Sequence, residues 1–238
     1  MHRRVDDPDL LPPTARRHSV AVDLHDAAHD VDAHFPGVAL PEGAQGWARK
    51  RRIEALAGRL CAREALRALG SPHADAPIAA DASRAPVWPP GVVGSITHTQ
   101  GFASAAVAHA GELRALGIDS EERFTLDRAR RLDGHLAHPG EVARLTREGA
   151  LDEADAATVV FSAKESVFKC LHPSVRRYFG FHAARVVDAA GGVLVIRLTE
   201  GLTAEFAEGH ELRGRYAVTE THVHTAVALP WRRGAGGW

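Results

Sequence analysis

Apolar residues recur with a helical period in two stretches of the chain. In residues 47–69 they recur every three to four positions, with Gly70 directly after the last turn and Pro72 beyond it, which predicts a long helix that ends at residue 69. Its apolar face is supplied by Ile53, Leu56, Ala57 and Leu60. The same periodicity predicts a second helix over residues 155–171.

Other stretches alternate between apolar and polar residues and are predicted to be strands. In the first half they read VVGSITHT, FASAAVAHA and ELRALGIDSE. In the second half they read ARVVDAAGGVLVIRL, a hairpin pattern with Gly191-Gly192 at its turn, and RGRYAVTETHVHTAVALP. Residues 123–149 are expected to form helices or loops with a break at 138–140, and residues 1–46 show no clear pattern.

Helix-then-strands therefore occurs twice, about half a chain apart. We interpret this order as an α+β protein made of two similar α/β lobes related by a pseudo-twofold, each a helix packed on a small antiparallel sheet. The lobes are predicted at residues 1–112, which carry the long basic helix, and at residues 113–238. The alternative is a chance likeness of two hairpins.

Composition narrows the classes of function. The 238 residues are 45% hydrophobic and 25% charged with a net charge of -1, so a protein that coats nucleic acid or an anionic membrane is not expected. The 15 histidines are scattered without zinc-ligand spacing. Cys61 and Cys170 are expected to be buried hydrophobes in a reducing compartment, and without a signal core or spanning segment we expect a cytoplasmic protein.

A lysine breaks the apolar face of the second helix. At about 100° per residue, Lys164 falls within the arc of apolar side chains, whereas Glu165 and Lys169 lie beside it. A helix that only covered a core would not place a lysine there. Either its ammonium reaches water on the long side chain, or an anion meets it.

Two carboxylates follow a predicted strand in GIDSEE, residues 117–122. In an extended segment Asp119 and Glu121 point to the same side while Ser120 points away, and Gly117 allows another backbone or a ligand to come close. Adjacent carboxylates repel unless a proton or a cation intervenes, and Mg²⁺ prefers such oxygen ligands. The alternative is a solvated acidic strand end.

Basic residues gather on the first helix in a stripe at its apolar border. Its members are Arg49, Arg52, Arg59, Arg63 and Arg67, whereas Arg51 lies off it. The stripe predicts either a solvated face or a phosphate clamp, because the arginine fork suits phosphate oxygens. Thr97 and His98, at the end of the GSITH strand, offer a hydroxyl and an imidazole to a ligand, although a structural histidine remains open there.

Taken together, these motifs resemble the 4'-phosphopantetheinyl transferases, in particular those that activate enterobactin and surfactin synthetases. The resemblance runs from about residue 47 to 228, with KRRIEALAGRLCAREAL, RAPVWPPGVVGSITH, GIDSEE and FSAKESVFKCLHPSVRRYFGF in the family's order. It implies Mg²⁺-dependent transfer of 4'-phosphopantetheine from coenzyme A to a serine of an apo acyl- or peptidyl-carrier protein, with release of 3',5'-ADP. Such enzymes serve fatty acid, polyketide or nonribosomal peptide synthases.

The resemblance also implies a role for each site residue. Asp119, Glu121 and Glu165 would hold Mg²⁺, with Mn²⁺ as an alternative, on the diphosphate of coenzyme A. Glu165 would come from the opposite lobe to the other two acids, so the active site would lie at the seam between the lobes. Lys164 and Lys169 would face phosphate oxygens, which would answer the question that Lys164 raises. Glu165, as the base, and Lys169 would be catalytic.

The remaining cofactor contacts follow from the same resemblance. The nucleotide end of coenzyme A would be held by Arg51, Arg59, Arg84, Thr97 and His98, with Arg84 near the adenine. Periodicity favours Arg52, Arg59 and Arg63 instead, so the two arguments agree only on Arg59. Thr97 stands where many members have serine, a change that keeps the hydroxyl.

The partner implied is an acidic, helical carrier protein. We expect it to dock on residues 124–149 and the arginines beside and within this segment, Arg123, Arg128, Arg130 and Arg131. The enzyme is expected to be a monomer that binds neither nucleic acid nor membrane. Two alternatives are a non-catalytic regulatory protein that binds coenzyme A or a nucleotide, and a nucleic-acid-binding module that uses the basic helix. The neutral net charge disfavours the second.

Overall fold

The computed structural model describes residues 2–23, 31–148 and 151–231. Helices and antiparallel sheets are mixed along the chain, which confirms the α+β class. The chain divides into two compact units. The first unit comprises Met1–Asp7 and Pro12–Leu116, and the second comprises Pro8–Leu11 and Gly117–Trp238.

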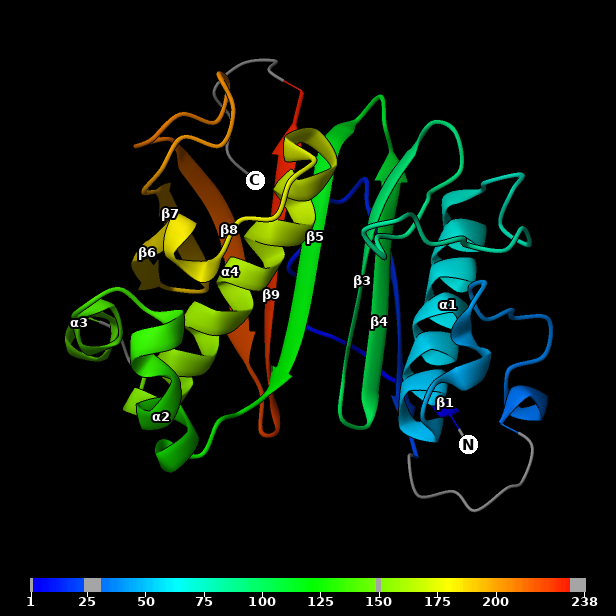
Figure 1. Ribbon diagram of the computed structural model, residues 1–238, viewed down its shortest axis with the longest axis horizontal. Helices are drawn as coiled ribbons and strands as arrows, with labels where there is room; N and C mark the ends of the chain where they lie inside the picture. Colours follow the sequence, from blue (N-terminus) through cyan, green and yellow to red (C-terminus); the bar gives the residue numbers. More distant parts are fainter. Residues whose placement is uncertain (1, 24–30, 149–150, 232–238) are drawn as a thin grey trace. The chain divides into compact units, whose positions relative to one another are not determined.

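The first unit is a helix on a four-stranded sheet of order β1-β2-β4-β3 (Figure 1). Its strands are β1 (His2–Arg4), β2 (Arg16–Val22), β3 (Val92–Thr99) and β4 (Phe102–His109), and all neighbouring pairs are antiparallel. The helix is α1 (Arg49–Leu69), and two 3-10 turns cover Asp32–His34 and Ala44–Gly46.

Helix α1 forms where the apolar period predicts it. Its buried side chains, including Leu56 and Leu66, pack on the valines and alanines of β2 and β4. The helix ends because Gly70 adopts the left-handed conformation and its N–H reaches the carbonyls of Leu66 and Arg67. The predicted helix over residues 47–69 is therefore confirmed to within two residues.

Strand β2 is the element of this unit that the sequence does not reveal. It lies between β1 and β4, with Val20 opposite Ala103. Residues Arg16–Val22 read RRHSVAV, so only their second half shows an apolar alternation. The strand forms because its ladder to β4 and the burial of Val20 and Val22 under α1 supply what the local pattern lacks.

The second unit contains a five-stranded sheet of order β5-β9-β8-β7-β6 (Figure 1). The strands are β5 (Leu113–Glu122), β6 (Ala184–Ala190), β7 (Val193–Leu198), β8 (Glu211–Val218) and β9 (His222–Pro230). The helices are α2 (Leu126–Leu136), α3 (Glu141–Glu148) and α4 (Glu153–Val175), and a 3-10 turn covers Phe181–Ala183. The hairpin predicted at Gly191-Gly192 and the break at residues 138–140 are both confirmed.

Helix α4 packs on β9 and β5 at very short range. A Cβ on residue 117 would overlap the carbonyl oxygen of Ser166 and the backbone nitrogen of Cys170. Gly117 is therefore needed for the backbone of α4 to approach β5. The hydroxyl of Thr225 on β9 lies 2.9 Å from Ser162 Oγ and 2.7 Å from Ser166 Oγ, which fixes the helix along the sheet.

The division into units corrects one expectation. The boundary falls inside β5, between Leu116 and Gly117, so Asp119, Glu121 and Glu165 all belong to the second unit. The expectation that Glu165 comes from the opposite lobe to the other two acids is therefore wrong. The pseudo-twofold and a site at the seam stay predictions.

A helix that crosses a membrane must be both long and apolar. Within residues 2–23, 31–148 and 151–231, no helix combines the length and the apolar character that crossing a bilayer requires.

Candidate active site

Three carboxylates of the second unit influence one another at the contact of β5 with α4. Asp119 and Glu121 come from β5, where strand alternation sends both to the same side. Lys169 of α4 donates from Nζ to Asp119 Oδ1 at 2.6 Å. Ser120 points away instead, and its hydroxyl lies 2.9 Å from His224 Nδ1 on β9.

Burial and the repulsion between neighbouring carboxylates raise two pKa values in this cluster. Burial raises the pKa of Glu121 to about 8, and the negative charge of Asp119 adds to the shift. The positive charges of Arg128 and Lys169 oppose it. Burial also raises the pKa of Glu165, again helped by Asp119 and opposed by Lys169. These acids are therefore costly to ionise together unless a cation joins them.

The donor set suits a hard divalent cation, because it consists of carboxylate oxygens that gain from a positive charge between them. The arrangement itself is not a ready-made metal cage. Within the described ranges, no three side chains among His, Cys, Asp and Glu are placed to hold a metal ion together. The residues thus fit Mg²⁺ by chemistry, and the ammonium of Lys169 stands beside Asp119 in this structure.

Lys164 has a different partner from the one expected. Its side chain is only 1% exposed, and its ammonium donates to Glu141 Oε2 and to the carbonyl of Leu136, both at 2.8 Å. Burial lowers the pKa of Lys164, while the charge of Glu141 opposes the shift. The expectation that Lys164 faces phosphate oxygens is therefore corrected. The lysine interrupts the apolar arc because a buried carboxylate pairs with it.

Glu141 completes this buried network. Its Oε2 also accepts from the backbone N–H of His138 at 2.7 Å, and its Oε1 accepts from the N–H of Val186 at 2.6 Å. The carboxylate therefore ties the loop before α3 to β6, and through Lys164 to α4. Removing either charged partner would leave the other buried without its counter-charge.

A separate cavity of about 350 Å³ lies in the first unit and gathers most of the predicted nucleotide contacts. It is lined by residues of α1, β3 and two loops, among them Arg51, Arg59, Arg84 and His98. Arg51 Nη1 donates to His98 Nε2 at 2.7 Å, and its guanidinium lies 5.4 Å from the ring centroid of Trp47. Arg51, which does not belong to the basic stripe, therefore lines the cavity.

Arg59 lies deeper in the cavity wall than Arg51. Its Nε donates to the carbonyl of Ile78 at 3.2 Å and its Nη1 to that of Ala55 at 3.3 Å. Burial lowers the pKa of Arg59, and the charge of Arg51 adds to this shift. Two guanidinium groups that repel each other in a concave site favour an anion between them.

Thr97 does not share this cavity with His98. Neighbouring residues of a strand face opposite sides of the sheet, and Thr97 pairs in register with Ser104 on β4. The Ser104 hydroxyl bonds to Ser19 and Arg17, on the face away from α1. Thr97 is 2% exposed there, on the face of the sheet opposite to His98, and a contact of both residues with coenzyme A stays a prediction.

Two members of the basic stripe have structural partners. Arg63 donates to the carbonyl of Pro36 at 2.7 Å and lies 3.1 Å from Glu64. Arg67 pairs with Glu64 and, through two nitrogens, with Asp75. Of the arginines of the stripe, only Arg59 is among the residues that line the cavity, where it is joined by Arg51 from beside the stripe.

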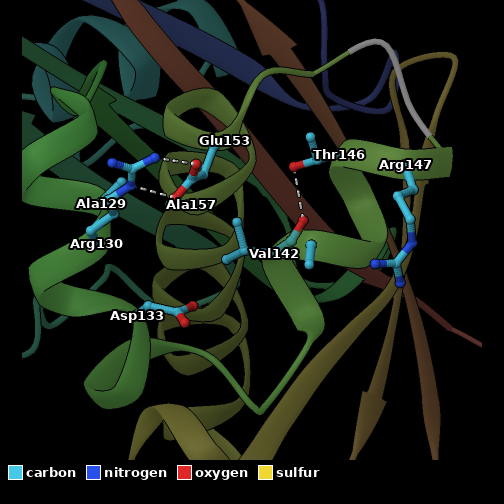
Figure 2. Close-up of a pocket in the computed structure, with 9 residues that line it drawn as sticks. Ala129, Arg130, Asp133, Val142, Thr146, Arg147, Glu153 and Ala157 are labelled. Carbon is cyan, nitrogen blue, oxygen red and sulfur yellow. Dashed lines mark hydrogen bonds and ion pairs between the residues drawn. The ribbon is translucent and has the colours of Figure 1, made fainter.

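A second cavity, of about 410 Å³, lies among α2, α3 and α4 (Figure 2). Ala129, Val142 and Ala157 form its apolar part, and charged side chains border it. Figure 2 shows Arg130 bound to Glu153 on one side, through Nε to Oε1 at 3.0 Å and Nη2 to Oε2 at 3.1 Å. No sequence pattern predicts this cavity, because its walls come from three separate helices.

The four arginines expected to dock a carrier are not equivalent. Arg123 forms two bonds to Asp155, at 2.7 and 2.8 Å, and Arg130 is paired with Glu153. Arg128 stacks on the ring of Phe124 at 4.0 Å. Arg131 is exposed on the same helix. Residue 149, the end of the expected docking segment, lies outside the described residues.

Comparison with known proteins decides the family. Residues 41–108 match the model of the 4'-phosphopantetheinyl transferase N-terminal domain, and residues 115–226 match that of the 4'-phosphopantetheinyl transferase superfamily. The chain is 39% identical over 200 residues to 4'-phosphopantetheinyl transferase Svp of Streptomyces mobaraensis, covering 79% of this chain and 78% of that protein. The chain belongs to the 4'-phosphopantetheinyl transferases.

Two further relatives show how far the likeness extends. The 4'-phosphopantetheinyl transferase PptT of Mycobacterium tuberculosis is 38% identical over 205 residues, which cover 82% of this chain and 88% of that protein. Enterobactin synthase component D of Escherichia coli is 43% identical over 121 residues, 51% of this chain and 55% of its own length. The resemblance noted in the motifs is thus confirmed, including the enterobactin-type relatives.

Proposed function

We propose that this phosphopantetheinyl transferase uses coenzyme A and Mg²⁺ to modify a serine of an apo acyl- or peptidyl-carrier protein of fatty acid, polyketide or nonribosomal peptide synthesis. The observation that carries the proposal is a group of three carboxylates beside the ammonium of Lys169, in which Asp119 is buried and Glu121 and Glu165 are half-buried. Such a group has little structural value, because its members repel one another, and gains stability when it binds a cation.

The cavity of the first unit is proposed to bind the nucleotide end of coenzyme A. Its cationic side chains, Arg51, Arg59 and Arg84, suit the phosphate groups of 3',5'-ADP, and His98 supplies a further hydrogen-bonding group. Trp47 offers an aromatic surface on the same wall. A nucleotide fits such a mixture of cations and aromatic area better than an apolar ligand would.

The transfer step forms one bond and breaks one bond. The serine oxygen of the carrier forms a bond to the phosphorus that bears pantetheine, and the bond from that phosphorus to the oxygen of the 3',5'-ADP phosphate breaks. The serine proton passes to Glu165, directly or through a water, since a hydroxyl attacks poorly unless a base removes its proton. The ammonium of Lys169 moves from Asp119 to the phosphate oxygens and stabilises their negative charge.

Asp119, Glu121 and Glu165 would hold Mg²⁺, or Mn²⁺ in its place. When bound, the ion supplies charge neutralisation and alignment of the diphosphate. Lys164 is given no part in this step, since Glu141 occupies its ammonium.

Mass spectrometry of an apo carrier tests the proposed function. Incubation with the enzyme, coenzyme A and Mg²⁺ should add one phosphopantetheine to the carrier serine, and chelation should stop the reaction reversibly. A panel of acyl-, aryl- and peptidyl-carrier proteins would identify the class served. If no carrier gains mass although coenzyme A binds, the non-catalytic binding protein is the better description.

Carrier docking is proposed on α2 and α3, around the second cavity. Arg131 and Arg147 are exposed there, whereas Arg123 and Arg130 are held by acidic partners. Arg131→Glu with Arg147→Glu should raise the KM for an acidic carrier about tenfold or more, because two charges are reversed. The Kd for coenzyme A should not change.

Arg213→Glu, on the exposed side of β8, is the matched control for this charge reversal. It should leave the KM for the carrier at the parent value. Equal effects of the control and the double variant would contradict the proposed docking surface.

A cytoplasmic monomer completes the proposal. Both cysteines, Cys61 and Cys170, are buried free thiols, as expected of a reducing compartment. Size-exclusion chromatography with light scattering would measure the oligomeric state.

A further inference from the structure

A five-residue turn holds one of the cavity arginines, and it is organised by a single carboxylate. Asp81 Oδ1 accepts from the backbone N–H and the hydroxyl of Ser83, at 2.8 and 2.6 Å, and from the N–H of Ala85 at 2.9 Å. The backbone closes the same turn, because Asp81 N–H donates to the Ala85 carbonyl at 2.9 Å. Three donors on one exposed loop thus depend on one oxygen atom.

Arg84 lies inside this turn in an unusual conformation. Its φ is +66°, in the left-handed region that residues with a side chain seldom adopt, and its N–H donates to the Asp81 carbonyl at 2.9 Å. Such a conformation persists only where the surroundings impose it. The turn is closed at its base by the bridge between Ala80 and Pro86.

The turn also forms part of the nucleotide cavity. Asp81, Arg84 and Pro86 line it together with Arg51 and Arg59. A negative carboxylate in a cavity built for phosphates would weaken anion binding if it acted only as a charge. Its three hydrogen bonds point to a different role.

We propose that Asp81 is a positioning residue for coenzyme A, which acts by holding Arg84 in the left-handed conformation that presents its guanidinium to the cavity. This inference rests on the proposed function. Without the Asp81 carboxylate oxygen, the turn relaxes and Arg84 spends most of its time away from the bound nucleotide. Asp81 itself does not take part in the chemical step.

Isothermal titration of coenzyme A into four variants of the full chain tests this role. Asp81→Ala should weaken binding about tenfold, as should Arg84→Ala, since each removes the same charge-assisted contact. Asp81→Asn keeps an oxygen that can accept the three hydrogen bonds, so its Kd should stay within about threefold of the parent. The Asp81→Ala/Arg84→Ala double variant should bind as Arg84→Ala does.

Steady-state kinetics separate positioning from a general loss of structure. In Asp81→Ala the KM for coenzyme A should rise with its Kd while kcat stays close to that of the parent, because Lys169 and Glu165 are untouched. Asp75→Ala removes another carboxylate from the same loop region, where it pairs with Arg67, and should leave the Kd unchanged.

Three results would overturn the proposal. The first is a further tenfold weakening when Asp81→Ala is added to Arg84→Ala, and the second is equal binding by Asp81→Ala and Asp81→Asn. The third is a fall in kcat without a change in KM. All three leave the proposed function standing, whereas a parent protein that fails to bind coenzyme A would remove the proposed function as well.

Discussion

Two lysines of α4, five residues apart, form ion pairs that look alike and do different things. Lys164 binds Glu141 at 2.8 Å and Lys169 binds Asp119 at 2.6 Å. The first pair is almost fully enclosed, with both side chains at most 1% exposed, and its carboxylate accepts further hydrogen bonds from two backbone N–H groups. In the second pair the lysine side chain is 25% exposed and stands next to carboxylates of raised pKa.

The difference shows that the surroundings of an ion pair matter more than its length. A buried pair with every polar atom satisfied holds elements together, and little can be exchanged there. In a partly exposed pair beside other carboxylates, the lysine can bind a phosphate instead and the carboxylate can bind a metal ion instead. The structural role of Lys164 and the proposed catalytic role of Lys169 therefore make separate predictions.

The largest effect is expected at Asp119, the carboxylate that pairs with Lys169 and is proposed to bind the metal ion. Asp119→Ala should lower the rate of carrier modification by about 10³-fold or more, since a metal ligand contributes several kcal/mol to the transition state. The measurement is the mass gain of an apo carrier against time. Asp119→Asn keeps the shape of the side chain and should be nearly as inactive. Activity near the parent value in both variants would remove the metal argument.

The next largest effect is a loss of stability, expected when the buried pair of Lys164 and Glu141 is broken. Lys164→Ala leaves Glu141 buried without its counter-charge and should lower the free energy of unfolding by about 3–5 kcal/mol. Denaturant titration followed by circular dichroism measures this. Lys164→Met combined with Glu141→Gln removes both charges and should recover part of the loss. A Lys164→Ala protein as stable as the parent would contradict the structural role.

Replacing the lysine of the partly exposed pair, Lys169 with Asp119, should lower activity and not stability. Lys169→Ala should lower kcat/KM by about 10²-fold, the effect of removing one electrostatic contact to developing charge. Its free energy of unfolding should change by no more than about 1 kcal/mol, because a partly exposed pair contributes little. If Lys169→Ala lost stability as Lys164→Ala does, the contrast between the two pairs would disappear.

The smallest effect, counted per pH unit, is the dependence of stability on pH. The pKa of Glu121 is raised to about 8 in the metal-free protein, so the folded state holds a proton that the unfolded state loses near pH 4.5. Stability should therefore fall as pH rises from about 4.5 to 8, by at most about 1.4 kcal/mol per pH unit. Thermal unfolding at several pH values measures the slope, which Glu121→Gln should reduce. A slope unchanged in that variant would assign it to other groups.

The local sequence pattern predicted most helices and strands, but it did not predict which side chains contact one another. The helices over Arg49–Leu69 and Glu153–Val175 follow from apolar spacing, and that spacing also marked Lys164 as anomalous. Its partner Glu141 lies 23 residues away on another helix, where no periodicity could point to it. Strand β2 was missed for a similar reason, since its place in the sheet depends on pairing with β4.

The predicted site residues divide in the same way. Strand alternation correctly sends Asp119 and Glu121 to one side, and the same rule, applied to Thr97 and His98, separates two adjacent residues that the family resemblance had grouped. In the cavity Arg51 contacts the ring of Trp47 and the imidazole of His98, two tertiary contacts that helical periodicity does not describe.

Titration of Mg²⁺ into the protein in the presence of 3',5'-ADP, followed by calorimetry, most directly tests whether the three acids form a metal site. The parent should bind the ion, Asp119→Ala and Glu165→Ala should lose most of the heat, and Asp188→Ala, which removes an exposed carboxylate of β6, should match the parent. Identical titration curves for all four proteins would contradict the account.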